Sequence, residues 1–83
     1  MKRKSYEYYA KFEYVEDGIT VTFPDLPGCI TCGYRTEEAI EMAKEALALY
    51  LEDIPEENIP EPTIIGADLL EQHEKIYLIS VVL

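Results

Sequence analysis

The sequence predicts an α+β domain in which one helix crosses a four-stranded sheet and the elements follow the order βββαβ. Three observations predict this fold class. Apolar and polar side chains alternate over residues 6–23, residues 36–52 repeat with a helical period, and residues 76–83 are almost continuously apolar. Eighty-three residues suffice for one such domain, which we expect to span residues 1–83.

The first two strands are expected to form a β-hairpin. From Tyr6 to Tyr14 every second residue is apolar or aromatic, and the residues between them are mostly charged. This period of two is typical of a sheet with one buried face. Glu16-Asp17-Gly18 then supplies a turn in which glycine can take a positive φ, and residues 19–23 resume the alternation.

A proline-containing loop separates the second strand from a short third one. Pro24 and Pro27 lack the N–H that a central strand needs for its ladder. Residues 24–28 therefore form a connection, and the third strand covers about residues 29–34. Gly33 weakens this strand near its end, which suits an edge strand or a bulge.

The two cysteines of the chain, Cys29 and Cys32, lie in this third strand. Residues three apart point to opposite faces of a strand, which disfavours a disulfide. Only His73 could join them on zinc, which takes four ligands. We therefore expect both cysteines to be small buried apolar residues.

A helix is expected over residues 36–52. The Thr36 hydroxyl can cap free N–H groups, and the acids of the first turn complement the positive end of the helix. The polar positions fall within an arc of about 120°. They are Glu37, Glu38, Glu41, Lys44, Glu45 and Glu52. Only Ala48 interrupts this arc, and the other positions from Ala39 to Leu51 are apolar and cover ~200°, although a helix on a sheet usually needs a stripe of only ~100°. The excess includes Ile40, Leu49 and Leu51. This excess is either covered by the following segment or offered to a second chain.

An irregular segment and a last strand follow the helix. Prolines at 55, 60 and 62 allow neither a helix nor a central strand there. We expect an extended tether that packs Ile54 and Ile59 on the domain. The apolar run Ile76–Leu83 fits a strand that is buried on both faces and parallel to its neighbour. A right-handed crossover would set this strand beside the first one.

Charge limits the classes of partner. Seven basic and seventeen acidic residues give a net charge of −10, which repels nucleic acid and anionic membranes. Between Thr36 and Glu74, twelve acids and one base give a local net charge of −11. This acidic region either serves only for solubility or forms a docking surface for a basic partner.

No apolar run reaches the ~18–20 residues of a membrane span, and no apolar signal core follows Met1–Lys4. We therefore expect a cytoplasmic protein.

The sequence offers little support for an enzyme. His73 lies in a polar stretch, where an exposed side chain is expected rather than a general base. No Gly-rich phosphate loop, metal-ligand pair or nucleophile elbow is present. The βββαβ order is also the opening of the ribonuclease H fold, whose two-metal site takes acids from the first strand, the helix and the fourth strand. Glu7 or Glu13 could serve from the first strand and Glu38, Glu41 or Glu45 from the helix, but the expected fourth strand, Ile76–Leu83, has no acid. We expect no catalytic residue, metal site or cofactor.

Three parts of the sequence together form a recognisable pattern. The longest is the run Phe-Pro-Asp-Leu-Pro-Gly-Cys-Ile-Thr-Cys-Gly at residues 23–33. The other two are Glu38-Ala39 with residues 43–47 in the helix, and the proline-rich residues 59–63. In this combination the sequence resembles the HicB antitoxin family. The resemblance implies a partially degraded ribonuclease H-like domain that neutralises HicA, a small basic toxin that cleaves mRNA.

The resemblance is incomplete in two places. The family usually shows Gly-Asp-Thr before the helix, whereas Gly33-Tyr34-Arg35 stands here and moves the expected cap to Thr36. HicB antitoxins also commonly continue into a DNA-binding module, whereas this sequence ends at Leu83. We expect that this segment does not bind DNA, either as a stand-alone antitoxin domain or as part of a longer protein.

Four acidic residues form the candidate partner-binding site. Glu38, Glu41 and Glu45 lie one helical turn or less apart on the polar arc, and Asp25 lies in the loop before the third strand. Their carboxylates would face the Lys and Arg side chains with which a toxin holds RNA phosphates. Tight binding would come from apolar anchors, for which the extra helix flank and the tyrosines are candidates. We expect a HicA-like toxin and a second copy of the chain as partners.

Two other functions remain open at this point. One is self-association without a toxin, through an exposed strand edge and the wide apolar stripe of the helix. The other is residual metal-dependent nuclease activity. A small basic protein that co-purifies with the chain would favour the antitoxin function over both.

Overall fold

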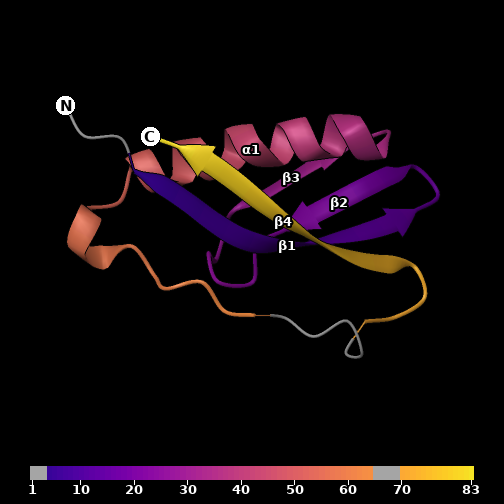
Figure 1. Ribbon diagram of the computed structural model, residues 1–83. Helices are drawn as coiled ribbons and strands as arrows, with labels where there is room; N and C mark the ends of the chain where they lie inside the picture. Colours follow the sequence, from indigo (N-terminus) through magenta and orange to yellow (C-terminus); the bar gives the residue numbers. More distant parts are fainter. Residues whose placement is uncertain (1–3, 65–69) are drawn as a thin grey trace.

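A four-stranded antiparallel sheet carries one long helix on one of its faces (Figure 1). The computed structural model describes residues 4–64 and 70–83. The strands lie in the order β3-β2-β1-β4, and each neighbouring pair is antiparallel. The elements are β1 (Ser5–Val15), β2 (Gly18–Thr22), β3 (Ile30–Gly33), α1 (Thr36–Glu52), the 3-10 helix η1 (Glu56–Asn58) and β4 (Glu74–Val82). The predicted α+β class and its βββαβ order are confirmed. Neither helix of the described residues is long and apolar enough to cross a membrane.

Strands β1 and β2 form the predicted hairpin. Val15 pairs with Gly18, so that Glu16 and Asp17 make up a two-residue turn. Gly18 adopts a φ of 145°, and a Cβ at this position would lie 2.9 Å from the carbonyl oxygen of Gly33. The turn therefore requires glycine both for its backbone conformation and for the close approach of β3.

The core lies between the sheet and α1. The even-numbered residues of β1 face the helix, so that Tyr8, Ala10 and Phe12 are buried, whereas the odd-numbered residues are half-buried or exposed. The helix completes this core with Ala39, Ala43, Leu47 and Leu51. The other buried residues are Ile19, Val21, Phe23, Leu26, Cys29 and Ile79. The helix approaches the sheet closely, because a Cβ on Gly33 would lie 2.8 Å from the Cα of Ala39.

Strand β4 lies beside β1, as predicted, but runs antiparallel to it. Of the β4 residues only Ile79 is buried, and Leu78 and Val82 are 47% and 59% exposed. The predicted parallel strand with two buried faces is therefore wrong. The reason is the connection: α1 ends near the start of β1 (Figure 1), yet β4 begins at the far end of β1, where Glu74 pairs with Glu13. After α1 the chain therefore runs back along the length of β1 before β4 begins. This return segment, and not the helix alone, makes β4 antiparallel to β1.

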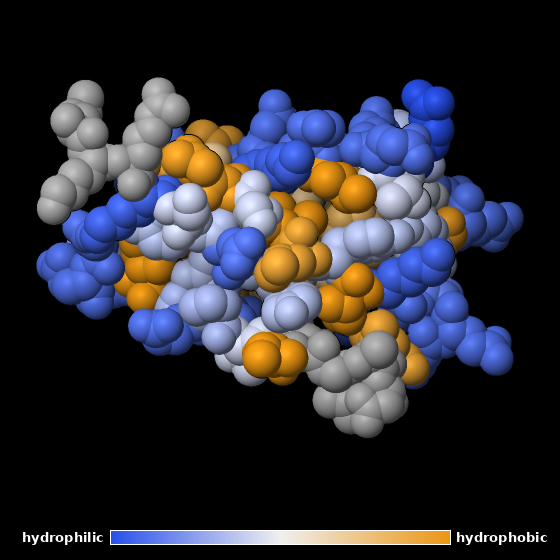
Figure 2. All heavy atoms as spheres, in the orientation of Figure 1, coloured by the Kyte–Doolittle hydropathy of each residue, from blue (hydrophilic) through white to orange (hydrophobic). Residues whose placement is uncertain are grey.

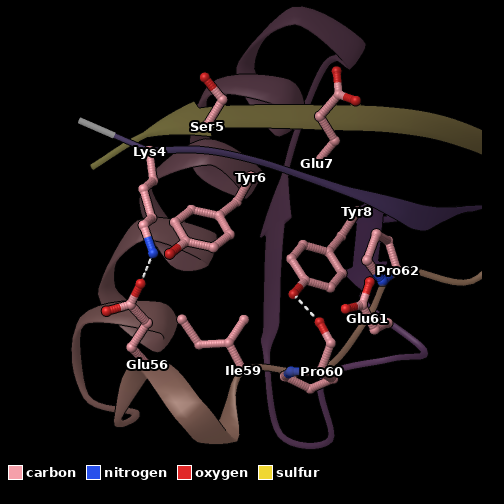
Figure 3. Close-up of a pocket in the computed structure, with 10 residues that line it drawn as sticks. All are labelled: Lys4, Ser5, Tyr6, Glu7, Tyr8, Glu56, Ile59, Pro60, Glu61 and Pro62. Atoms are coloured by element: carbon pink, nitrogen blue, oxygen red, sulfur yellow. Dashed lines mark hydrogen bonds and ion pairs between the residues drawn. The ribbon is translucent and has the colours of Figure 1, made fainter. Parts of the chain in front are cut away.

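The proline-rich segment after α1 lies against the first half of β1 (Figure 3). The hydroxyl of Tyr8 donates a hydrogen bond to the carbonyl oxygen of Pro60. Ile59 packs on the core and Ile54 is half-buried. The packing predicted for Ile59 is therefore confirmed, whereas the short helix η1 interrupts the extended course that was expected.

The tether and β1 border a cavity of about 500 Å³ (Figure 3). Lys4 lies at one end of it, where it forms an ion pair with Glu56. Among the described residues that line the cavity, Lys4 is the only base, and Glu7 and Glu61 add negative charge. Because its one cation is already paired, the cavity does not suit an anionic ligand.

The two cysteines have different environments. Both are free thiols; Cys29 is buried and Cys32 is exposed. Burial raises the pKa of the Cys29 thiol. The expectation of a buried apolar residue is confirmed for Cys29 but wrong for Cys32, because Cys32 points to the face of the sheet that no helix covers.

Candidate partner-binding face on helix α1

Helix α1 exposes a stripe of glutamates on the side that faces away from the sheet. Glu38, Glu41 and Glu45 are all exposed, and their spacing of three and four residues places them on one side of the helix. The whole helix carries five glutamates against a single lysine. We call Glu38, Glu41 and Glu45 the acidic stripe. It is the most concentrated group of predicted site residues in the structure.

The first turn of the helix holds Glu38 in place. The Glu38 carboxylate accepts a hydrogen bond of 2.6 Å from the backbone N–H of Tyr34. The N-cap residue is Arg35, and its side chain makes no capping bond. One free N–H before the helix is therefore satisfied by an acid inside the first turn, as in half of a capping box.

Thr36 does not cap the helix, so that prediction is wrong. It is the first helical residue, and its hydroxyl lies 2.8 Å from the hydroxyl of Tyr14. The Tyr14 hydroxyl is also 3.3 Å from that of Tyr77 in β4. The hydrogen bond to Tyr14 raises the pKa of Tyr77, and burial raises it further by a smaller amount. The threonine thus ties the helix to β1 and β4 instead of closing its N-terminus.

The other two members of the acidic stripe have weaker local partners. Lys44 lies 4.0 Å from Glu41, and both side chains are well exposed, so the pair contributes little to stability. Within residues 4–64 and 70–83, Glu45 makes no ion pair and its side chain makes no hydrogen bond. Glu41 and Glu45 are therefore free to meet a cation from another molecule at low cost.

Exposed apolar side chains border the acidic stripe. Met42 stands four residues after Glu38 and is 38% exposed, and Leu49 stands four residues after Glu45 and is 65% exposed. Next to the start of the helix, Tyr34 is 81% exposed. A hollow of about 390 Å³ lies here between α1 and the ends of β2 and β3. Its lining includes Val15, Ile19, Cys32, Tyr34, Glu38 and Met42.

Sequence analysis predicted only part of this apolar border. Of the three residues expected to form the excess flank, Leu49 is exposed, whereas Leu51 is buried and Ile40 packs on the core. Met42 was not named among the expected flank residues, although it is four residues from Glu38 and three from Glu45 and must share their side of the helix. Tyr34 belongs to the tyrosines that were expected as candidate anchors, but no pattern in the sequence singled it out from the others.

Asp25 does not lie in the acidic stripe. It is half-buried in the loop between β2 and β3, and its carboxylate accepts a 2.7 Å hydrogen bond from the N–H of Thr63. The same loop adjoins the C-terminal half of α1, where the Tyr50 hydroxyl donates to the carbonyl oxygen of Pro27 at 2.9 Å. The structure therefore gives Asp25 a role in holding the tether.

A second charged group lies where β1 meets β4. Strand β4 begins at Glu74, two residues earlier than expected, so it does carry an acid, and Glu74 stands opposite Glu13. The exposed His73 lies 3.1 Å from Glu13 through Nε2, and Lys11 lies 3.4 Å from Glu74. The backbone N–H of Glu71 donates to Glu74 and lowers the pKa of that carboxyl, and Lys11 lowers it further.

This second group contains three possible metal ligands. Atoms of Glu13, His73 and Glu74 lie within 4.8 Å of one another. However, Glu74 is already engaged by Lys11 and by the N–H of Glu71. Two facing carboxylates with separate partners account for the arrangement: Glu74 pairs with Lys11, and Glu13 lies within hydrogen-bond distance of His73. This group therefore gives no positive sign of a metal centre.

Comparison with known proteins identifies the family. A model of the HicB-like antitoxins of bacterial toxin-antitoxin systems matches residues 8–82. This chain belongs to the HicB-like antitoxin family. The resemblance noted in its sequence is therefore confirmed.

Individual HicB-like proteins agree with this assignment. Antitoxin HicB 2 of Photorhabdus laumondii is 42% identical over 72 residues, which cover 82% of this chain and 50% of that protein. The matched region thus spans about half the length of this and of two other curated relatives. A chain of a toxin-antitoxin complex from Streptococcus pneumoniae superposes with a TM-score of 0.76 at 23% identity, and covers 93% of this chain and 69% of that one. A chain of the HicA3 and HicB3 toxin-antitoxin complex gives 0.68 at 22% identity, with 89% and 95% covered. Both structures show the same fold.

Proposed function

We propose that this chain is an antitoxin that binds a small basic toxin of the HicA type and blocks its RNA-cleaving site. The observation that carries the proposal is the acidic stripe, three exposed glutamates on one side of α1 with apolar side chains along their border. The family supports it, since its members are antitoxins of toxin-antitoxin systems. The expected site of action is the cytoplasm, where the mRNA target would be found.

Charge and apolar contact would have separate roles in this complex. A toxin that cleaves RNA needs Lys and Arg side chains to hold phosphates. Carboxylates opposite those cations speed the encounter and select the partner. Met42, Leu49 and Tyr34 offer the exposed apolar area that tight binding requires. Glu38 is already held by the Tyr34 N–H, so less conformational freedom would be lost when the complex forms.

The antitoxin would act by occlusion rather than by catalysis. The order β3-β2-β1-β4 with one helix supports a relation to the ribonuclease H fold, but the antiparallel β4 departs from the parallel strand expected for it. We propose that the relation is one of element order only. No step of the proposed function uses a metal or a catalytic residue of this chain.

Charge reversal of the acidic stripe tests the proposal. The variant Glu38→Lys/Glu41→Lys/Glu45→Lys should associate with a HicA-type toxin about tenfold more slowly, or worse, at low ionic strength. The parent should show a steep fall of association rate with salt, and the variant little dependence. Stopped-flow or surface-binding kinetics at several salt concentrations would measure both.

Two further variants keep the result interpretable. Asp53→Lys/Glu57→Lys/Glu61→Lys makes the same change in net charge at exposed positions outside the stripe, so it should retain most of the rate and of the salt slope. Glu41→Lys/Glu45→Lys leaves the capping bond of Glu38 intact and guards against a helix that fails to form. Equal losses in the stripe variant and the matched control would show that binding responds only to net charge, and would refute the assignment of this face.

A further inference from the structure

Among residues 4–64 and 70–83, no strand pairs with the outer edge of β4. Strand β4 is the last strand in the order β3-β2-β1-β4 and runs over Glu74–Val82. Lys4 and Leu83 exchange both backbone hydrogen bonds, so the odd-numbered residues of β4 point their N–H and C=O groups at β1. The even-numbered residues therefore point these groups outward. Within the described residues, the only such group with a recorded partner is the N–H of Glu74, which bonds to the carbonyl oxygen of Glu71.

This edge lacks the features that normally prevent strands from pairing. From Ile76 to Leu83 there is no charged residue, no proline and no glycine, although edge strands are usually protected by charge, proline, a bulge or short length. The opposite edge differs, because β3 has only four residues and ends at Gly33. The fold thus protects one edge by its shortness and leaves the other as a long template.

The side chains beside this edge are apolar as well. The uncovered face of the sheet presents Tyr9 next to Leu78, with Ile76 and Val82 on either side along β4. Figure 2 shows hydrophobic residues gathered across the middle of the view, where β1 and β4 lie, and hydrophilic residues along its upper margin over α1. The apolar edge and the acidic stripe are therefore separate surfaces.

Charge indicates which partner fits the edge. The only charged residues of β4 are Glu74 and Lys75, which cancel. A cationic toxin finds nothing complementary there, whereas a second copy of a chain with a net charge of −10 would be repelled at most other surfaces. An antiparallel strand pair is also self-complementary around a two-fold axis. The neutral edge is the place where two acidic copies can meet.

We propose that β4 pairs with β4 of a second copy around a two-fold axis at Leu78. In this register, Ile76 faces Ser80 of the partner subunit and Glu74 faces Val82 of the partner subunit. The outward-pointing groups of the two strands meet throughout this register except at the N–H of Glu74, which is bonded to Glu71, and no like charges stand opposite each other. Two four-stranded sheets become one continuous sheet, the two Leu78 side chains touch, and both acidic stripes remain free. The inference does not depend on the proposed toxin.

A lysine at the centre of the edge tests the pairing. Leu78→Lys would set two cations side by side at the axis, whereas its side chain is exposed in the single chain and should not disturb folding. The matched control is Ile30→Lys, an exposed apolar residue on the opposite edge strand. Analytical ultracentrifugation should find a dimer for the parent and for Ile30→Lys, and a monomer for Leu78→Lys at the same concentrations.

Amide hydrogen exchange supplies a second readout. In the parent dimer the N–H groups of Ile76, Leu78, Ser80 and Val82 should be protected, and dilution or Leu78→Lys should release them. Those of Tyr77, Ile79 and Val81 point at β1 and should stay protected in every case. A parent that is monomeric at all concentrations would overturn the inference, as would a dimer that survives Leu78→Lys. Protection of the even-numbered amides only after a HicA-type toxin is added would assign the edge to the toxin and also overturn it.

Discussion

Tyr8 carries a polar group into the core beneath the tether. Its side chain is 1% exposed, and its hydroxyl finds an acceptor in the carbonyl oxygen of Pro60. Burial, and after it the nearby carboxylates of Asp25 and Glu61, raise the pKa of this phenol. The same residue therefore links the first strand to the tether and makes that junction sensitive to alkaline pH.

The raised pKa of Tyr8 predicts a loss of stability at high pH. The folded state binds the phenolic proton more tightly than the unfolded chain, so the contribution is complete below the ordinary tyrosine pKa of about 10. It is lost as pH rises through the higher pKa of the folded state. Tyr77 and Cys29 also have raised pKa values and act in the same direction.

Removing the Tyr8 hydroxyl shows how much of the loss of stability at alkaline pH is due to this one group. Tyr8→Phe should cost about 1 kcal/mol near neutral pH through the lost hydrogen bond, but its stability should fall less than that of the parent toward alkaline pH. Urea unfolding at a series of pH values would measure both. The exposed Tyr34→Phe serves as the control and should follow the parent. A Tyr8→Phe profile parallel to the parent at every pH would contradict the role given to Tyr8.

Single residues also mark the limits of sequence analysis. Thr36 has the residue type and position of an N-cap, but its hydroxyl is taken by Tyr14, a residue 22 positions away. Asp25 was expected to contact a partner, and sequence analysis did not predict that its carboxylate also accepts the N–H of Thr63. Both outcomes depend on long-range contacts, which no local pattern contains. The acidic stripe could be predicted because helical spacing alone determines it.

At the scale of elements, the junction between β2 and β3 depends on Phe23. Its ring is buried, its N–H donates to the carbonyl oxygen of Cys29 at 3.2 Å, and its own carbonyl accepts from Leu26 at 2.9 Å. The buried ring and these two backbone hydrogen bonds together hold the loop that contains Pro24 and Pro27 on the core. This junction sets the position of β3, and with it the hollow beside the acidic stripe.

Truncation of Phe23 should therefore destabilise the whole domain. Phe23→Ala is expected to cost about 3–5 kcal/mol, a large share of the ~5–15 kcal/mol that stabilises typical domains. Ile30→Ala, at a position that is 62% exposed, should change stability by less than about 0.5 kcal/mol. Urea midpoints compare the two variants directly. A Phe23→Ala midpoint close to that of the parent would show that the loop is not anchored by this ring.

The last strand shows what periodicity leaves open at this scale. A run such as Ile76–Leu83 fits either a strand buried on both faces or an edge strand with an apolar uncovered face. The hairpin and the helix are determined by short-range spacing and were predicted correctly, whereas the direction of β4 depends on the course of the chain after α1. Its first residue, Glu74, was missed because the ladder with β1 continues into the polar stretch.

For the whole molecule, the two proposed interfaces occupy different places. The acidic stripe lies on the outer side of α1, and the neutral edge belongs to β4. A dimer formed through β4 would therefore present two acidic stripes and could hold two toxin molecules. The acidic charge predicted a basic partner from the sequence, but the separation of the two surfaces follows only from the strand order.

Inhibition of the toxin is the most direct test of the central claim. A HicA-type toxin should cleave RNA until the antitoxin is added, and activity should then fall in proportion to the antitoxin and vanish at a fixed ratio of chains. The variant Glu38→Lys/Glu41→Lys/Glu45→Lys should fail to protect the RNA at that ratio, and the chain alone should cleave nothing in Mg²⁺ or Mn²⁺. Full inhibition by this variant, or metal-dependent cleavage by the chain alone that is lost in Glu13→Gln, would contradict it.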